Sequence, residues 1–285
     1  MSVERSGRRF SWRWLLMLAT TGVVLFLLVR HLAGGRPFLD VLVRGRWELV
    51  PALLVLLAGM LCVNALRWNL ILRLMGYRVP YGRALRVVLA TRALDLMAPS
   101  RANDLLRPLG IRDYVPLVEG SGSVLAQRAI DVQSLCLLAI AGGVAAGLFE
   151  WSAVAAALLA LGWATVGLMY WRRRVLVRLP VARRFTDSIR RLAEAFRALA
   201  RRPAGFAAVA ALSLLAWVGA LGLVWGLSLV FSADLAPLSI AALWPLAIFV
   251  GMLPLTVAGM GTRDAAFLSL LALTGATPVD DARVL

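Results

Sequence analysis

The sequence contains no lysine, one histidine and two cysteines, and each shortage removes a class of function. A Walker A phosphate loop and a Schiff-base enzyme both require a lysine, so neither is encoded. Because His31 is the only histidine, the sequence does not support a Ser-His-Asp triad, a multi-histidine metal site or a histidine proton relay. Cys62 and Cys136 stand far apart in apolar stretches, which is typical of small core residues. We therefore expect no cofactor and no metal.

Acidic residues are also scarce, with 15 against 31 arginines, while 61% of the chain is hydrophobic and the mean hydropathy is +0.82. This composition lies outside the range of soluble domains, so the chain requires lipid as its solvent. The arginines sit between apolar runs rather than on a soluble surface. That pattern indicates membrane topology and anionic lipid, not a nucleic-acid partner.

Five apolar runs approach or exceed the roughly 20 residues that cross a bilayer. We expect them to be transmembrane helices at residues 12–29, 49–66, 132–149, 151–171 and 204–231. Tryptophans lie near several of their ends, as interfacial aromatic belts require. Four arginines lie ahead of the apolar core of the first run, residues 15–29, and we expect this run to be an uncleaved helix with a cytoplasmic N-terminus.

Two further apolar regions, residues 85–107 and 235–275, are interrupted by charges, prolines and glycines. Each is expected to form a re-entrant hairpin or a broken helix. The fold class predicted is therefore an all-α polytopic membrane protein with about five full spans and two such hairpins. If the hairpins enter from opposite faces, they form the inverted arrangement from which transporters build binding sites.

Residues 172–202 form the longest polar stretch and carry eleven arginines, which places them in the cytoplasm by the positive-inside rule. Apolar residues recur there at spacings of four and three, so the stretch can lie on anionic headgroups as an amphipathic helix, although a solvated linker fits equally well. We divide the chain accordingly into an N-terminal membrane half (1–171), a basic linker (172–203) and a C-terminal membrane half (204–285).

The first hairpin region carries polar residues around a helix break. The proline leaves backbone groups without helical hydrogen bonds, and planar guanidinium groups nearby match the oxygens of a phosphate. We therefore expect this region to bind an anionic lipid headgroup. The candidate substrate-binding residues are Pro99, Ser100, Arg101, Asn103, Asp104 and Arg107. Arg128 and Asp131 follow three residues apart at the base of the next helix. They are expected to pair, with a structural and a functional role both open.

The second hairpin region contains a comparable constellation. Its glycines permit the tight turn that a re-entrant tip needs, and the following half-helix would point its positive N-terminus at the site. The candidate residues are Pro254, Gly259, Gly261, Arg263 and Asp264. If the two hairpins converge near the midplane, Arg101 and Arg263 would lie close together.

In this order the two constellations, together with Arg128-x2-Asp131 and the pair Arg67-Trp68, resemble the lysylphosphatidylglycerol synthase transmembrane-region family. The resemblance covers nearly the whole chain and implies a flippase-like domain associated with moving aminoacylated phosphatidylglycerol, other lipids or polyprenyl-linked sugars. The family usually has Gly and Glu where Asn103 and Asp104 stand, and Glu in place of Asp264. Members usually continue into one more membrane helix beyond the position of Leu285. No counterpart of the soluble aminoacyl-transferase domain is present in the sequence.

These observations predict a non-enzymatic lipid translocase of the bacterial cytoplasmic membrane, with membrane lipids of anionic headgroup as its partners. Arg101, Arg107 and Arg263 would contact the headgroup, while Asp104 and Asp264 would orient them or carry a coupling proton. Three alternatives stay open. They are a secondary transporter for a small polar solute, an accessory subunit of a lipid-modifying enzyme, and, with less support from the short outer loop, a membrane glycosyltransferase.

The topology can be tested at residues 172–202. Eleven arginines in one connection resist translocation, so a cysteine at Ser188→Cys should stay hidden from a membrane-impermeant thiol reagent in intact cells. The measurement uses a background in which Cys62 and Cys136 are replaced, with permeabilised cells as the positive control. Labelling from outside would overturn both the topology and the inverted arrangement.

Overall fold

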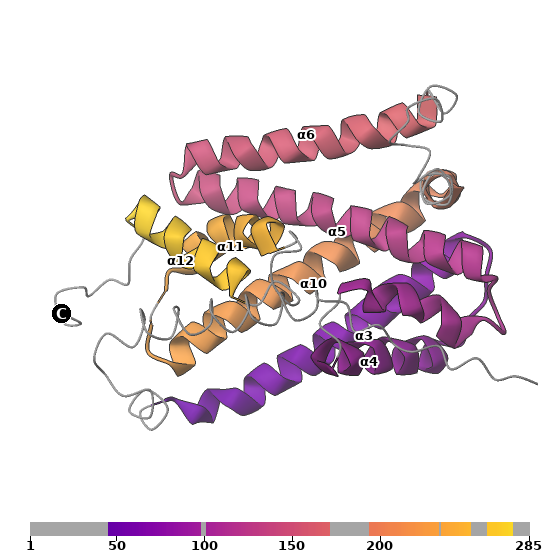
Figure 1. The fold of residues 1–285 in the computed structure, drawn as a ribbon, viewed down its shortest axis with the longest axis horizontal. Helices are drawn as coiled ribbons and strands as arrows, with labels where there is room; N and C mark the ends of the chain where they lie inside the picture. Colours follow the sequence, from indigo (N-terminus) through magenta and orange to yellow (C-terminus); the bar gives the residue numbers. More distant parts are fainter. Residues whose placement is uncertain (1–44, 98–100, 172–193, 234, 252–260, 276–285) are drawn as a thin grey trace, which may run out of the picture.

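The computed structural model describes residues 45–97, 101–171, 194–233, 235–251 and 261–275 (Figure 1). Throughout these ranges the secondary structure is helical and contains no strand, which confirms the all-α fold. The elements are η1 (Trp47–Leu49), α3 (Val50–Leu74), α4 (Tyr81–Met97), η2 (Arg101–Ile111), α5 (Leu117–Ala145), α6 (Phe149–Trp171), α10 (Pro203–Val230), α11 (Pro237–Gly251) and α12 (Thr262–Thr274). The expected first span at residues 12–29 and residues 172–193 of the basic linker lie outside the described residues.

Three of the described helices are long and apolar enough to cross a membrane: η1 with α3, α5, and α10. Parts of α6 and α11 form shorter apolar helices. Helix α5 begins at Leu117, well before the apolar run that starts at residue 132. The expected boundary was therefore wrong, because the charged turn that contains Arg128 and Asp131 continues the helix. A helix tolerates such charges at depth when partners on neighbouring helices neutralise them.

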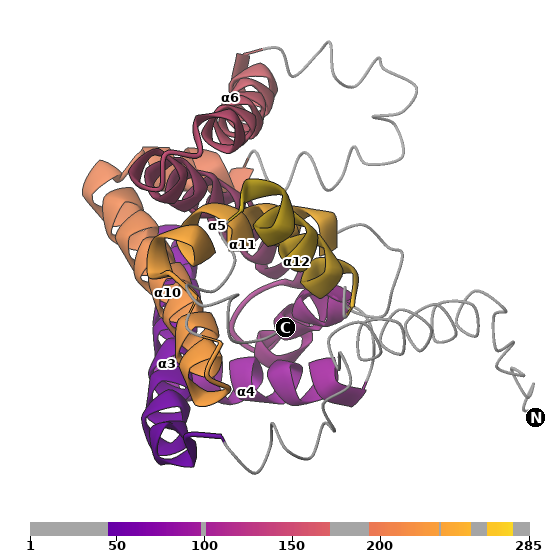
Figure 2. The same ribbon diagram turned by 90° about the vertical axis from the view of Figure 1, so that its left-hand side faces the viewer.

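The two interrupted regions are each built from a pair of short helices. Helices α4 and η2 flank residues 98–100 and pack on each other and on α3 and α5. Helices α11 and α12 flank residues 252–260 and pack on each other, and α11 also packs on α5 (Figure 2). The pairs lie toward opposite ends of the bundle: α4 and η2 where α3 ends, and α11 and α12 where α10 ends (Figure 1).

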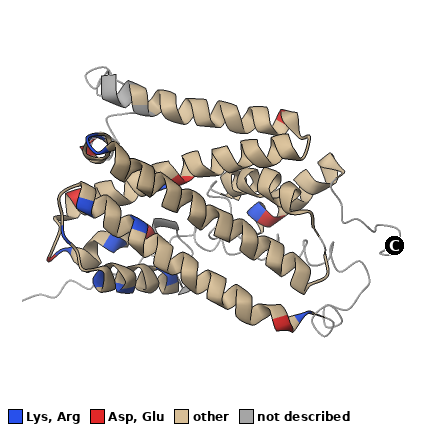
Figure 3. Ribbon diagram, turned by 180° about the vertical axis from the view of Figure 1, so that it is seen from behind, with Lys and Arg blue, Asp and Glu red and all other residues tan. Residues whose placement is uncertain are grey.

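Charge is distributed unevenly over the bundle. Helix α10 contains no charged residue and α6 only Glu150, while charged positions gather where α3 ends and α4 begins (Figure 3). Large apolar side chains such as Leu54, Val55 and Leu161 are exposed on the outer faces. An apolar exterior of this kind is suited to contact with lipid chains.

Close helix contacts depend on small residues, as is usual between membrane helices. At Gly142 of α5, an added Cβ would lie 2.6 Å from the backbone of Ala241 in α11. The backbone of α11 cannot rotate away as a flexible side chain could. The approach of α11 to α5 therefore requires glycine at this position.

We predict that Gly142→Ala destabilises the protein by about 1–3 kcal/mol, because the added methyl group forces α11 away from α5. Gly59→Ala is the matched control, since a Cβ there would meet nothing within 4 Å. It should leave stability unchanged or raise it by up to about 1 kcal/mol. Thermal unfolding in detergent measures both variants, and equal midpoints would contradict the close contact.

Candidate functional site

A buried carboxylate and two arginines form the first part of the site. Asp104 and Arg107 lie three residues apart on η2, where 3₁₀ geometry places such residues one above the other. Arg107 Nη2 lies 2.6 Å from Asp104 Oδ1, and only 2% of Arg107 and 3% of Asp104 are exposed. Arg128 of α5 forms an ion pair with the second oxygen, Oδ2. The carboxylate therefore lies between two guanidinium groups from different elements; we call these three residues the Asp104 cluster.

Arg107 also links the cluster to α3, α4 and α5. Its Nε donates a long hydrogen bond to Thr91 Oγ1 and its Nη1 another to Gln127 Oε1, both at 3.4 Å. The guanidinium carbon lies 5.8 Å from the ring centroid of Trp68, within cation–π range. Gln127 in turn donates to Asn64 Oδ1 at 2.8 Å. A planar group with five N–H donors suits such a junction, because it contacts several helices at once.

A second buried ion pair connects α3 to α5. Both terminal nitrogens of the Arg67 guanidinium group donate to Asp131: Nη1 donates to Oδ1, and Nη2 donates to Oδ2 at 3.2 Å. From α10, Ser213 and Trp217 donate to the same Oδ1 at 2.9 and 3.1 Å. Arg67 and Asp131 are only 3% and 6% exposed. The pair therefore holds three long helices together at a position removed from solvent.

The pairing corrects one expectation from the sequence. Arg128 and Asp131 were expected to neutralise each other, but Arg128 pairs with Asp104 and Asp131 pairs with Arg67. Residues three apart on a helix point about 60° apart, so each faces a different neighbour. Arg128 faces η2, whereas Asp131 faces α3 and α10. Arg128 and Asp131 therefore each pair with an opposite charge on another element.

Along α3 and α5 the cluster and the ion pair form one polar layer. Its five charged side chains are three arginines and two aspartates: Arg67, Arg107, Arg128, Asp104 and Asp131. Arg67 pairs with Asp131, while Arg107 and Arg128 share Asp104. The Arg128 side chain is 42% exposed, so it forms the accessible edge of an otherwise buried cluster.

The second constellation lies at the start of α12. Gly261 has a φ of +83°, which glycine adopts readily, and its N–H donates to Asp264 Oδ2 at 3.2 Å. Arg263 donates from Nε and Nη2 to Asp264 Oδ1 at 3.0 and 2.9 Å. The guanidinium also stacks on Trp244 of α11, 4.7 Å from the ring centroid. About a third of each charged side chain is exposed, so this pair is open to an incoming anion.

The remaining candidates are only partly placed. Pro99, Ser100, Pro254 and Gly259 lie outside the described residues. Arg101 and Asn103 belong to η2, although their side chains are not described. Sequence reasoning gave no site role to Arg67, Gln127, Ser213 or Trp217. Arg67 had a signal, as a charge inside an apolar helix, whereas Ser213 and Trp217 look like ordinary residues of a span.

Within the described residues, no group of three His, Cys, Asp or Glu side chains is arranged to hold a metal ion. The chemistry available at the described constellations is therefore that of guanidinium and carboxylate groups. Arginine forks bind phosphate and carboxylate oxygens in pairs. The arrangement is suited to recognising an anion within the bilayer.

A family described as "Lysylphosphatidylglycerol synthase TM region" matches residues 13–280, which is most of the chain. No curated protein and no solved structure matches the chain.

We predict that Arg67→Met and Asp131→Leu each destabilise the protein by about 3–5 kcal/mol, because each strands a buried charge. The double variant should recover much of that loss. Combining Arg128→Met with Asp131→Leu is the control, and the two losses should add. Unfolding in detergent gives the free energies, and recovery in the control pair rather than in the Arg67 pair would contradict the pairing.

Proposed function

Because the chain belongs to the lysylphosphatidylglycerol synthase TM region family, we propose that it translocates an anionic phospholipid or a polyprenyl-phosphate-linked lipid across the membrane. The observation that carries the proposal is that two guanidinium groups, one buried and one accessible, meet at a single carboxylate in the Asp104 cluster. Such forks bind phosphate oxygens in pairs. A lipid phosphate that enters the cluster would take the place of the carboxylate.

The geometry of the cluster would allow a lipid phosphate to replace the Asp104 carboxylate at the arginines. The Asp104 carboxylate pairs with Arg107 on its buried side and with Arg128 on its accessible side. A phosphate approaching past Arg128 would compete for the same N–H donors. Because Asp104 holds the arginines in place beforehand, the lipid need not order them on binding.

Arg263 and Asp264 would provide a second binding site for the headgroup. They lie in the first turn of α12, in the other interrupted region, and the pair is partly exposed. We propose that Arg101 and Arg263 complete the headgroup contacts, and that Asp104 and Asp264 orient the arginines or carry a coupling proton. Movement from one hairpin to the other would transfer the headgroup across the bilayer.

The ion pair of Arg67 and Asp131 would have a positioning role. Hydrogen bonds from Arg67, Ser213 and Trp217 already occupy the Asp131 carboxylate. A phosphate gains little there, because the charges of the pair cancel. We propose that the pair fixes α3, α5 and α10 while the hairpins bind the lipid.

We further propose that the chain performs no catalysis itself and acts in the bacterial cytoplasmic membrane with its N-terminus in the cytoplasm. Helix pairs at opposite ends of the bundle would equally suit a secondary transporter for a small polar solute. A lipid-modifying enzyme that supplies the lipid is a natural partner, and the chain would then be its membrane subunit.

The experiment reconstitutes the purified chain in liposomes with fluorescent phosphatidylglycerol and follows its movement between leaflets. Arg128→Lys and Arg263→Lys keep the charge but remove the planar fork, so each should slow movement about tenfold or more with little change in stability. Arg101→Lys should behave in the same way. Arg112→Lys is the control, because its side chain is 74% exposed beside Asp113.

The outcomes separate the alternatives. Parent-like movement in all three lysine variants would mean that the arginines are structural and the site assignment is wrong. A parent chain that moves no lipid, and from which no phosphate lipid co-purifies, would favour the solute transporter. Lipid movement that appears only when an enzyme partner is added would favour the accessory subunit.

A further inference from the structure

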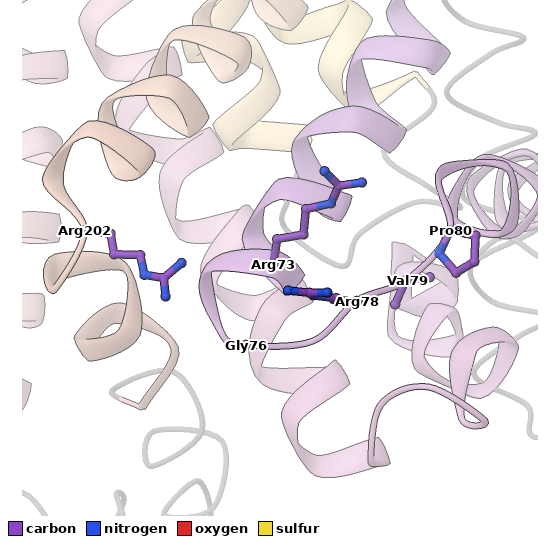
Figure 4. A pocket seen from close by; sticks show the side chains of 6 residues that line it. All are labelled: Arg73, Gly76, Arg78, Val79, Pro80 and Arg202. Carbon is purple, nitrogen blue, oxygen red and sulfur yellow. The ribbon is translucent and has the colours of Figure 1, made fainter.

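A pocket of about 740 Å³ opens at the end of the bundle where α3 ends and α10 begins, apart from the Asp104 cluster. Its walls come from the last turn of α3, the turn that leads into α4, and the residue that precedes α10 (Figure 4). The lining residues are Arg73, Gly76, Arg78, Val79, Pro80 and Arg202. The volume lies within the range of small-molecule sites.

The backbone around the pocket is firmly held. Helix α3 ends in a Schellman motif: Gly76, with a φ of +97°, donates to the Arg73 carbonyl at 3.0 Å, and Tyr77 donates to the Leu72 carbonyl at 2.9 Å. The buried side chain of Asn69 donates to the Val79 carbonyl at 2.7 Å. These bonds fix the turn that carries two of the arginines.

The opposite wall is fixed by close packing. Gly205, in the first turn of α10, lies against the side chain of Leu74, where an added Cβ would collide with a methyl group. Leu199, just before α10, is fully buried in a cluster with Ile71 of α3. The start of α10 therefore stays next to the end of α3, which holds Arg202 beside Arg73 and Arg78.

The pocket is cationic, because its described walls contain three arginines and no acidic residue. Arg78 and Arg202 extend toward each other from opposite walls (Figure 4). By contrast, the nearby Arg83 donates to the Gly110 carbonyl and pairs with Asp113. Within the described part of the chain, no hydrogen bond or ion pair engages the guanidinium groups of the three pocket arginines.

The turn adds no negative charge of its own. Burial, and then the Glu119 carboxylate, raise the pKa of Tyr77 above its usual value, so its phenol stays neutral at physiological pH. Like charges converging on one space repel each other unless an anion lies between them. The arrangement thus favours a ligand with several acceptor oxygens.

We propose that this pocket binds a phosphate group, held by the guanidinium forks of Arg73, Arg78 and Arg202. Phosphate presents oxygens to several forks at once, and each charge-assisted hydrogen bond is stronger than a neutral one. The phosphate could belong to a lipid headgroup at the membrane surface or to a soluble phosphate compound. The site differs from the translocation site proposed above in its residues and its position, and it does not depend on translocation.

The test compares two variants that lose the same charge. Arg73→Gln/Arg78→Gln/Arg202→Gln removes the pocket arginines, while Arg86→Gln/Arg112→Gln/Arg201→Gln removes three arginines outside the lining. The delipidated full chain is titrated in detergent at low salt with inorganic phosphate, dioctanoyl phosphatidylglycerol and dioctanoylglycerol. The pocket variant should bind the first two probes at least about tenfold more weakly than the parent and the control.

The probes also identify the source of the phosphate. Phosphatidylglycerol that binds more tightly than inorganic phosphate, and only with the pocket intact, points to a lipid headgroup. Equal binding of both points to a soluble phosphate compound. Equal weakening in the pocket and control variants, or no weakening in either, overturns the proposal. Thermal unfolding of both variants checks that each is folded, and parent-like lipid movement by the pocket variant leaves the proposed function intact.

Discussion

The ion pair of Arg67 and Asp131 is the constraint on which the rest of the structure depends. Within a bilayer a charge must be neutralised by another part of the protein, because no water can solvate it. Asp131 meets this requirement with donors from α3 and α10 as well as its own position on α5. The three long helices are therefore joined at one point, and their relative register follows from it.

With these helices fixed, the broken helices pack into the remaining space. Helices α4 and η2 pack against α3 and α5, and Arg107 donates to acceptors on α4 and α5 and lies over the Trp68 ring of α3. Helix α11 instead approaches α5 at Gly142, where the two backbones are in close contact, and α12 packs on α11 with Arg263 over the ring of Trp244. Polar contacts thus position α4 and η2, and close backbone packing positions α11.

The sequence predicted the all-α fold and the apolar helices α3, α5 and α10, because the apolar character of a run is a local property. An apolar run of sufficient length must be a helix in lipid. The partner of a buried charge is not local. The spacing of Arg128 and Asp131 places both on neighbouring faces of α5, yet which helix lies opposite each face depends on the tertiary packing. Ser213 and Trp217 could not be recognised, since nothing in α10 distinguishes them before α5 is beside it.

The two charge centres of the polar layer differ in how accessible they are. Further donors fill the carboxylate of the Arg67–Asp131 pair, so removing either residue strands a buried charge. In the Asp104 cluster two guanidinium groups share one carboxylate, and the Arg128 side chain is 42% exposed. An anion that approaches the accessible side could compete for these donors. The same reasoning underlies the proposal for the pocket at the end of the bundle, whose described lining holds three arginines and no carboxylate.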